Sequence, residues 1–340
     1  MIETLRNRFP VPGVRFHRRG RIVVMELTNS HGSVSITPMG ATVLSYLPEG
    51  KNEVMWVSET AHFDGERPVR GGIPVCWPWF GAHPSDPAQK AHGFVRRLPW
   101  EIESVTVEGD ITRAVLRLEA DETTHRIWPH EFVLRLALTL GDTLRLDLTA
   151  ENRDDETWEL SEALHSYFRV RDARDVNVHG LEGLTYWDKQ QGGRRGIQTS
   201  PLRICPPVDR VFFGHLGRSV IDDGSRRITI DKAGSASTVV WNPGPDGVLD
   251  FDDIPANDWH ELLCVETANA IDDRYVLRPN ERHTLSTTIH TEKTTPPPLA
   301  SIRSVARVAT SPFPILRRML HPSARWARRD RSCVDASRLA

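Results

Sequence analysis

Apolar and polar residues alternate with a period of two along most of the chain. The clearest case is LRLALTLGDTLRLDLTA, residues 134–150, in which leucines occupy every second position on both sides of Gly141 and Asp142. Successive side chains of an extended chain point to opposite faces, so these leucines share one face. The pattern predicts a β-hairpin with one buried side and a turn at Gly141 and Asp142.

Similar alternation recurs in segments separated by Gly, Pro, Asn and Asp, namely 21–28, 33–38, 41–47, 111–120, 226–232, 236–241 and 281–291. No amphipathic helix of ordinary length is readable before residue 299. Many strands at short spacing with almost no helix predict an all-β fold of two large antiparallel sheets packed face to face.

The strand pattern stops at TTPPPLA, residues 294–300. Residues 1–293 show no break in composition, so we expect one β-sandwich domain there, followed by a Pro-led, Arg-rich tail over 294–340. A short basic helix in the tail would be interrupted by Pro322. The tail is expected to be flexible and solvated, with a weak membrane or partner contact as the alternative.

Composition places the chain among soluble globular proteins, with 26% charged and 39% hydrophobic residues. The formal charge of −2 is uneven, because residues 299–340 contain nine arginines and only two acidic residues. The remainder has 43 − 9 = 34 basic and 45 − 2 = 43 acidic residues, a charge of −9. An acidic body argues against a nucleic-acid partner, so a bound phosphate would need a few local cations.

The first residues contain no signal-like apolar segment, and no apolar run is long enough to span a membrane. We therefore expect a cytoplasmic protein. The four cysteines, Cys76, Cys205, Cys264 and Cys333, are far apart in the sequence. Such spacing favours free thiols over a zinc knuckle or a disulfide framework.

Two strand-like stretches carry residues suited to proton transfer. In SEALHSYFRV, residues 161–170, His165 faces away from the side shared by Leu164 and Phe168. It is therefore either a surface residue or part of a polar cleft. In WHELLCVETANA, residues 259–270, Glu266 occupies an apolar strand, where desolvation raises the proton affinity of a carboxylate towards that of a general base unless a salt bridge explains it.

Two loops carry arginine beside aromatic residues. RGGIPVCWPWFG, residues 70–81, combines Arg70 with tryptophans whose flat faces suit a sugar ring, although a structural corner would look the same. AHGFVRRLPWEI, residues 91–102, contains His92 and Arg96, in a pattern that by itself is also typical of a turn with solvated arginines.

Taken together in chain order, RGGIPVCWPWFG, HGFVR, ALHSYF, VDRVF and CVETA resemble the hexose-6-phosphate mutarotases, or glucose-6-phosphate 1-epimerases, of the aldose 1-epimerase superfamily. The resemblance covers roughly residues 15–292. It implies a β-supersandwich with a concave, sugar-binding sheet, and a hexose phosphate as substrate. The implied reaction needs no cofactor and no metal.

The resemblance also implies roles for six residues. His165 matches the catalytic acid and Glu266 the catalytic base. The substrate-binding positions are those of Arg70 and Arg96 for the phosphate, Asp209 for the sugar hydroxyls and His92 at the wall of the cleft. Such a pair would rest with Glu266 ionised and His165 protonated, because an opposite charge nearby favours the protonated imidazole, and Tyr167 on the same face would help to orient His165.

Three positions depart from the family pattern. Ala91 stands where a glutamine is common, which would remove one polar substrate contact. Trp77 and Trp79 stand where other large apolar residues are common, and we expect them to reshape the pocket.

The expected reaction is the interconversion of α and β anomers by acid/base ring opening and closure. One alternative is an epimerase of unphosphorylated aldoses, which would not need Arg70 and Arg96 to converge. A non-catalytic carbohydrate-binding β-sandwich is a second. A glycoside hydrolase or lyase is a third, with Asp209 as the second carboxylate.

Overall fold

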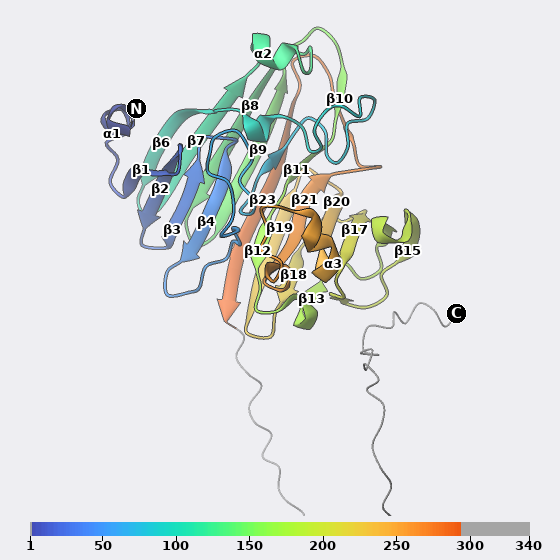
Figure 1. The fold of residues 1–340 in the computed structure, drawn as a ribbon. Coiled ribbons are helices and arrows are strands. Elements are labelled where there is room, and N and C mark those ends of the chain that lie inside the picture. The colour runs from blue at the N-terminus through green and yellow to red at the C-terminus, as the bar shows by residue number, and fades with distance from the viewer. Residues whose placement is uncertain (1, 294–340) are drawn as a thin grey trace, which may run out of the picture. The chain divides into compact units, whose positions relative to one another are not determined.

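The computed structural model describes residues 2–293, whose regular secondary structure consists almost entirely of β-strands (Figure 1). The largest sheet has nine strands in the order β16 (Leu202–Arg203), β13 (Asn177–His179), β18 (Ser219–Asp222), β19 (Arg226–Ala233), β23 (Arg282–Lys293), β9 (Leu144–Asn152), β8 (Phe132–Leu140), β7 (Ile111–Glu119) and β6 (Glu101–Glu108). Every pairing in it is antiparallel.

The second sheet has eight strands and is also antiparallel. Its order is β15 (Arg194–Ile197), β14 (Thr185–Asp188), β17 (Val208–Phe213), β20 (Ser237–Asn242), β21 (Leu262–Asn269), β11 (Glu162–Leu164) and β5 (Val75–Cys76), with β12 (Tyr167–Arg169) also paired to β21.

Two smaller sheets complete the fold. One contains β1 (Val14–Arg19), β2 (Ile22–Asn29), β3 (Gly32–Thr37) and β4 (Thr42–Pro48), and the other pairs β10 (Trp158–Leu160) with β22 (Tyr275–Leu277). The helices are α1 (Ile2–Arg8), α2 (Glu122–His125) and α3 (Gly244–Gly247), with 3-10 turns η1 (Val95–Arg97), η2 (Ala173–Asp175), η3 (Lys189–Gln191), η4 (Val248–Asp250) and η5 (Asp258–His260).

The inner face of the nine-stranded sheet is covered by the eight-stranded sheet and the four-stranded sheet. β21 and β11 of the eight-stranded sheet pack against β23, while β2 and β3 pack against β7 and β8. The leucines of the predicted hairpin lie in this core with no exposed surface, and Leu140 pairs with Leu144 where β8 turns into β9. The predicted hairpin and the all-β class are therefore confirmed.

The other seven predicted segments also form strands, as β2, β3, β4, β7, β19, β20 and β23. Within residues 2–293 the longest helix is α1, with seven residues, as the missing amphipathic periodicity predicts. None of the described helices is long and apolar enough to cross a membrane. The prediction for the tail over 294–340 lies outside the described residues.

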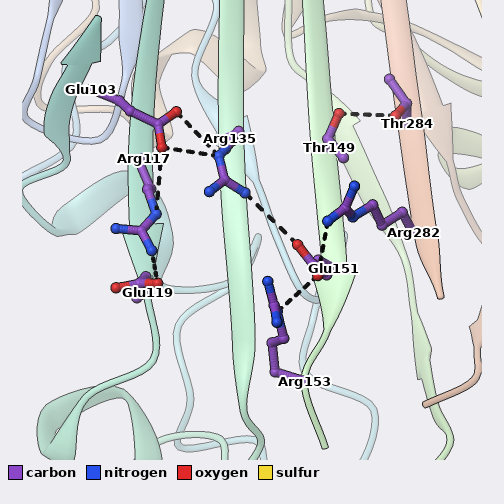
Figure 2. A network of polar contacts seen from close by, with 9 residues as sticks. All are labelled: Glu103, Arg117, Glu119, Arg135, Thr149, Glu151, Arg153, Arg282 and Thr284. Carbon is purple, nitrogen blue, oxygen red and sulfur yellow. Dashed lines mark hydrogen bonds and ion pairs between the residues drawn. The ribbon is translucent and has the colours of Figure 1, made fainter. Parts of the chain in front are cut away.

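The outer face of the nine-stranded sheet carries a set of paired charges that we call the outer network (Figure 2). Arg135 of β8 lies between two acidic residues, 3.1 Å from Glu103 and 3.8 Å from Glu151. Glu151 also pairs with Arg153 at 2.8 Å and with Arg282 at 3.2 Å. Each acidic group of the outer network lies against a guanidinium group, and opposite charges on neighbouring strands stabilise a sheet face.

Candidate active site

The candidate site lies on the face of the eight-stranded sheet that points away from the main core. Along β21, Leu263 and Val265 belong to the main core, so Cys264 and Glu266 project from the opposite face. The strand register then places one row of side chains across this face, made of Asp209, Trp241, Cys264 and Tyr167.

His165 lies between β11 and β12, beside Glu266. Its backbone N–H donates to the carbonyl of Pro74 at 3.0 Å, and its Nδ1 is 3.5 Å from Oε2 of Glu266. His165 is 7% exposed and Glu266 is 1% exposed, so the reading of His165 as a solvated surface residue is wrong. Within the described residues neither of these two facing atoms has a hydrogen-bond partner.

Burial sets the proton affinities of this pair. Burial lowers the pKa of His165 well below its usual value, and the charges of His92, Arg96 and Arg70 lower it further. Burial likewise raises the pKa of Glu266 well above its usual value, with Asp209 acting in the same direction and Arg96 opposing it. The expected resting ion pair is therefore wrong for the unliganded site, because the low-dielectric surroundings favour both neutral forms.

Tyr167 and Arg70 hold one side of His165. The rings of His165 and Tyr167 stack with centroids 4.7 Å apart and planes 9° apart. Nη1 of Arg70 donates to the Tyr167 hydroxyl at 3.2 Å, and Nε of Arg70 donates to Asp253 at 3.0 Å. Stacking on Tyr167, which is itself hydrogen-bonded to Arg70, thus orients the His165 imidazole, as expected for Tyr167.

His92 contacts the other side of His165, with ring centroids 5.5 Å apart. Burial lowers the pKa of His92 to about 3, with Arg96, Lys189 and Arg70 adding to the effect. Its Nδ1 accepts the N–H of Gly81 at 3.3 Å, so the neutral ring carries its proton on Nε2 and can donate a hydrogen bond.

The His92–Gly93 pair is shaped by its backbone. Both residues have positive φ, 66° and 67°. A Cβ on Gly93 would lie 1.8 Å from the Trp77 carbonyl oxygen, so only glycine fits this close approach.

Arg96 reaches the site from η1. One of its amino groups donates to the carbonyl of Ala91 at 2.9 Å, while its buried Nε has no hydrogen-bond partner among the described residues. Arg96 and Arg70 both lower the pKa of His92 and of His165, so the two arginines do converge on one region.

Asp209 projects from β17 into the same region. Burial raises its pKa, whereas Lys189, 3.3 Å away, lowers it. Asp209 in turn raises the pKa of Glu266. All six predicted site residues therefore gather in one region, linked by electrostatic effects on the pKa values of His92, His165 and Glu266.

The expectation that Trp77 and Trp79 reshape the pocket is wrong. Trp77 is fully buried in the main core, with its ring centroid 4.7 Å from that of Phe132, and Trp79 packs in the same core. Phe80, the next residue, is the aromatic ring that contacts His92 and His165, at centroid distances of 4.9 Å and 6.4 Å.

Sequence reasoning missed three contributors. Lys189 adds a third cation, but a single lysine before QQGG carries no signal in the sequence. Asp253, the partner of Arg70, lies 183 positions further along the chain. Cys264 appears in the sequence as a core thiol, yet its Sγ and single ligand atoms of His165 and Glu266 all lie within 4.8 Å of one another.

Comparison with known proteins identifies the family. The family model for aldose 1-epimerase matches residues 23–290. The chain belongs to the aldose 1-epimerase family. It is thus an isomerase of the epimerase or mutarotase type.

Two relatives carry the name "Putative glucose-6-phosphate 1-epimerase". The protein from Escherichia coli is 34% identical over 252 residues, which cover 73% of this chain and 84% of the relative. The protein from Cenchrus ciliaris is 31% identical over 254 residues, covering 71% and 76%.

Solved structures share the fold. A crystal structure titled as a putative mutarotase (YeaD) from Salmonella typhimurium has a TM-score of 0.78 at 30% identity, covering 84% of this chain and 95% of that one. A galactose mutarotase-like protein from Clostridium acetobutylicum, at 15% identity and a TM-score of 0.68 over 83% and 98%, shows the fold alone. The predicted family and architecture are therefore confirmed.

Proposed function

We propose that this aldose 1-epimerase family member interconverts the α and β anomers of a hexose 6-phosphate, with glucose 6-phosphate as the first substrate to test. The observation that carries the proposal is a buried acid/base pair, His165 and Glu266, surrounded by cations. The names of the relatives support the choice of a phosphate ester. We also propose a cytoplasmic location, which a free hexose phosphate as substrate supports.

The reaction needs one proton acceptor and one proton donor. With substrate bound, the proton of neutral Glu266 passes to neutral His165, 3.5 Å away, which gives an ionised base and a protonated acid. Glu266 then takes the proton of the C1 hydroxyl, and His165 gives its proton to the ring oxygen, so the C1–O5 bond breaks and the sugar becomes an open-chain aldehyde. Rotation about C1–C2 and closure with the reverse transfers form the other anomer. Each proton-transfer group contributes on the order of 10²–10⁴ in rate.

The phosphate would also prepare the acid for its role. Arg70 and Arg96 lower the pKa of His165 in the unliganded site. A dianion bound to these guanidinium groups offsets their charge and removes that effect, so protonation of His165 becomes more favourable when substrate is present. Lys189 lies close enough to His92 and Asp209 to serve as a third cation.

The other binding residues take complementary roles. Asp209 accepts hydrogen bonds from sugar hydroxyls, and His92 donates one from Nε2. A non-catalytic sugar-binding module is disfavoured, because it would have no use for a buried acid and base left without hydrogen-bond partners.

The test is anomer exchange measured by polarimetry or NMR on glucose 6-phosphate and on glucose. Arg96→Ala should raise KM for glucose 6-phosphate by about 10- to 100-fold, the value of one charge-assisted hydrogen bond, and change exchange of free glucose little. Arg97→Ala is the matched control, because it removes the same charge from the next residue of η1.

Two results would overturn the proposal. Equal losses on both sugars in Arg96→Ala would give this arginine a structural role. A wild-type preference for glucose over glucose 6-phosphate would assign the protein to the epimerases of unphosphorylated aldoses.

A further inference from the structure

The fold brings three chemically different ligand groups together at the candidate site. The sequence spacing shows no metal-binding motif, because His165 lies about 100 positions before Cys264 and Glu266. In the structure, Nδ1 or Nε2 of His165, Sγ of Cys264 and a carboxylate oxygen of Glu266 all lie within 4.8 Å of one another. Cys264 and Glu266 project from one face of β21, and His165 stands beside them.

A second observation is that two of these groups lack partners. Nδ1 of His165 and Oε2 of Glu266 are buried, have no hydrogen-bond partner among residues 2–293, and face each other across 3.5 Å. Buried polar atoms are usually satisfied, and lone pairs of imidazole and carboxylate that face one another form a cation-binding arrangement.

We propose that His165, Cys264 and Glu266 form an inhibitory binding site for Zn²⁺. Imidazole, thiolate and carboxylate are the three side-chain ligand types that zinc uses, and a three-ligand set leaves the fourth tetrahedral position for water. Zinc–ligand bonds of about 2.0–2.3 Å place ligand atoms roughly 3.5 Å apart, so separations within 4.8 Å need a contraction of about 1.3 Å at most. Oxygen-preferring cations such as Mg²⁺ fit this set poorly.

Binding at this place blocks the reaction. A cation bonded to His165 and Glu266 occupies the lone pairs that would transfer protons and fills the space between acid and base. Zn²⁺ and the sugar therefore compete for one site. Cys264 makes the site selective, because the thiol becomes a zinc-bound thiolate with release of its proton, and a thiolate favours a borderline-soft ion.

The experiment measures metal binding directly, without substrate, so its outcome does not depend on the proposed function. The full chain is titrated with Co²⁺, a spectroscopic probe for zinc sites, and Zn²⁺ affinity is then measured by displacement of Co²⁺. We expect one equivalent to bind with a thiolate-to-cobalt charge-transfer absorption. Glucose 6-phosphate, in a separate arm, should weaken Zn²⁺ inhibition.

Matched cysteine variants isolate the site. Cys264→Ala should abolish the charge-transfer band and weaken metal affinity by more than about 100-fold. The loss of a hydrogen-bond partner of a metal ligand alone weakens affinity by about 10–100-fold, and loss of the ligand itself should cost more. Cys76→Ala removes another fully buried thiol, from β5 of the same sheet and outside the three-ligand cluster, and should bind like the wild type. Metal held by other thiols persists in Cys264→Ala and can be subtracted.

Several outcomes would overturn the proposal. These are absence of stoichiometric binding at millimolar metal, undiminished affinity in Cys264→Ala, or equal losses in Cys76→Ala. Inhibition by Zn²⁺ that is unchanged in Cys264→Ala would place the inhibitory ion elsewhere.

Discussion

Two buried glutamates, one on each large sheet, differ in how far neighbouring charges compensate for their burial. The side chain of Glu151, in the outer network, is 6% exposed, and that of Glu266, in the candidate site, is 1% exposed. Burial acts to raise the pKa of both carboxyls. For Glu151 the guanidinium groups of Arg282, Arg153 and Arg135 outweigh burial and lower the pKa, whereas the pKa of Glu266 stays well above its usual value.

The difference lies in the partners rather than in the depth of burial. Glu151 has three guanidinium groups within 4 Å (Figure 2). Glu266 faces an imidazole that burial keeps neutral and an aspartate that repels it. An unpaired buried carboxyl costs folding free energy, and it is also the kind of group whose proton affinity suits catalysis. The outer network therefore contributes to the free energy of unfolding, whereas the unpaired carboxyl of the candidate site reduces it.

The largest effect that should separate the two regions is on activity. Glu266→Gln and His165→Ala should each lower kcat for anomer exchange by about 10²–10⁴, because each removes one proton-transfer group. Glu151→Gln should leave kcat unchanged. Polarimetric progress curves measure all three, with circular dichroism to check folding. Near-normal turnover in either site variant would show that its residue does not transfer the proton.

The second effect is on stability, and its sign depends on pH. The pKa of Glu266 in the folded protein is above 4.5, so the folded state holds this proton more tightly than the unfolded chain. Its contribution to stability is therefore complete below pH 4.5 and is lost as pH rises through the folded value. Above pH 4.5, Glu266→Gln should be more stable than the wild type. Its free energy of unfolding should be higher by about 1–3 kcal/mol once the wild-type carboxylate must ionise.

Urea unfolding at pH 5 and pH 8 measures this gain. The difference between variant and wild type is the diagnostic quantity, because Asp209 and Glu162 also have raised pKa values and shift the wild type in the same direction. A variant that loses stability relative to the wild type as pH rises would contradict the assignment of Glu266 as an unpaired carboxyl.

The outer network should give a smaller effect of opposite sign. Because the pKa of Glu151 is lowered from 4.5, its contribution to stability is present above pH 4.5 and is lost as pH falls. Glu151→Gln should destabilise the protein by about 1 kcal/mol at pH 7, because Arg153 and Arg282 are half exposed and solvent screens their charge. Raising the salt concentration should shrink this loss but not the gain in Glu266→Gln. A loss of stability that is independent of salt and pH would show that packing, rather than charge, accounts for the contribution of Glu151.

The strands and the buried hairpin could be predicted because they depend on local alternation. A period of two over seven or more residues, as in β7, β8 and β23, leaves few other ways to bury the apolar face. Short strands such as β5 and β16 have two residues each, too few to show a period, and the sequence gives no sign of them.

The six site residues could be predicted by resemblance, whereas their electrostatics could not. The facing of His165 follows from alternation, but its near-complete burial depends on Phe80, Trp241 and His92, which come from other segments. The expectation of a charged resting pair failed for this reason, since proton affinity depends on distant residues that fold around the pair. Trp77 was misplaced because a loop has no period from which the direction of a side chain can be read.

The smallest expected effect concerns the chain beyond both sheets. Truncation after Thr294 should leave kcat and KM unchanged and shift the melting temperature by less than about 2 °C. The reason is that the family match ends at residue 290 and β23, the last described strand along the chain, ends at Lys293, so every residue of the acid/base pair and of the outer network lies before the truncation point. Thermal unfolding and anomer exchange of the truncated chain measure this, with the full chain at the same salt concentration as the control.

A raised KM for the phosphate sugar alone would mean that the nine arginines beyond residue 299 assist substrate binding. A lowered melting temperature would mean instead that the tail packs on the domain.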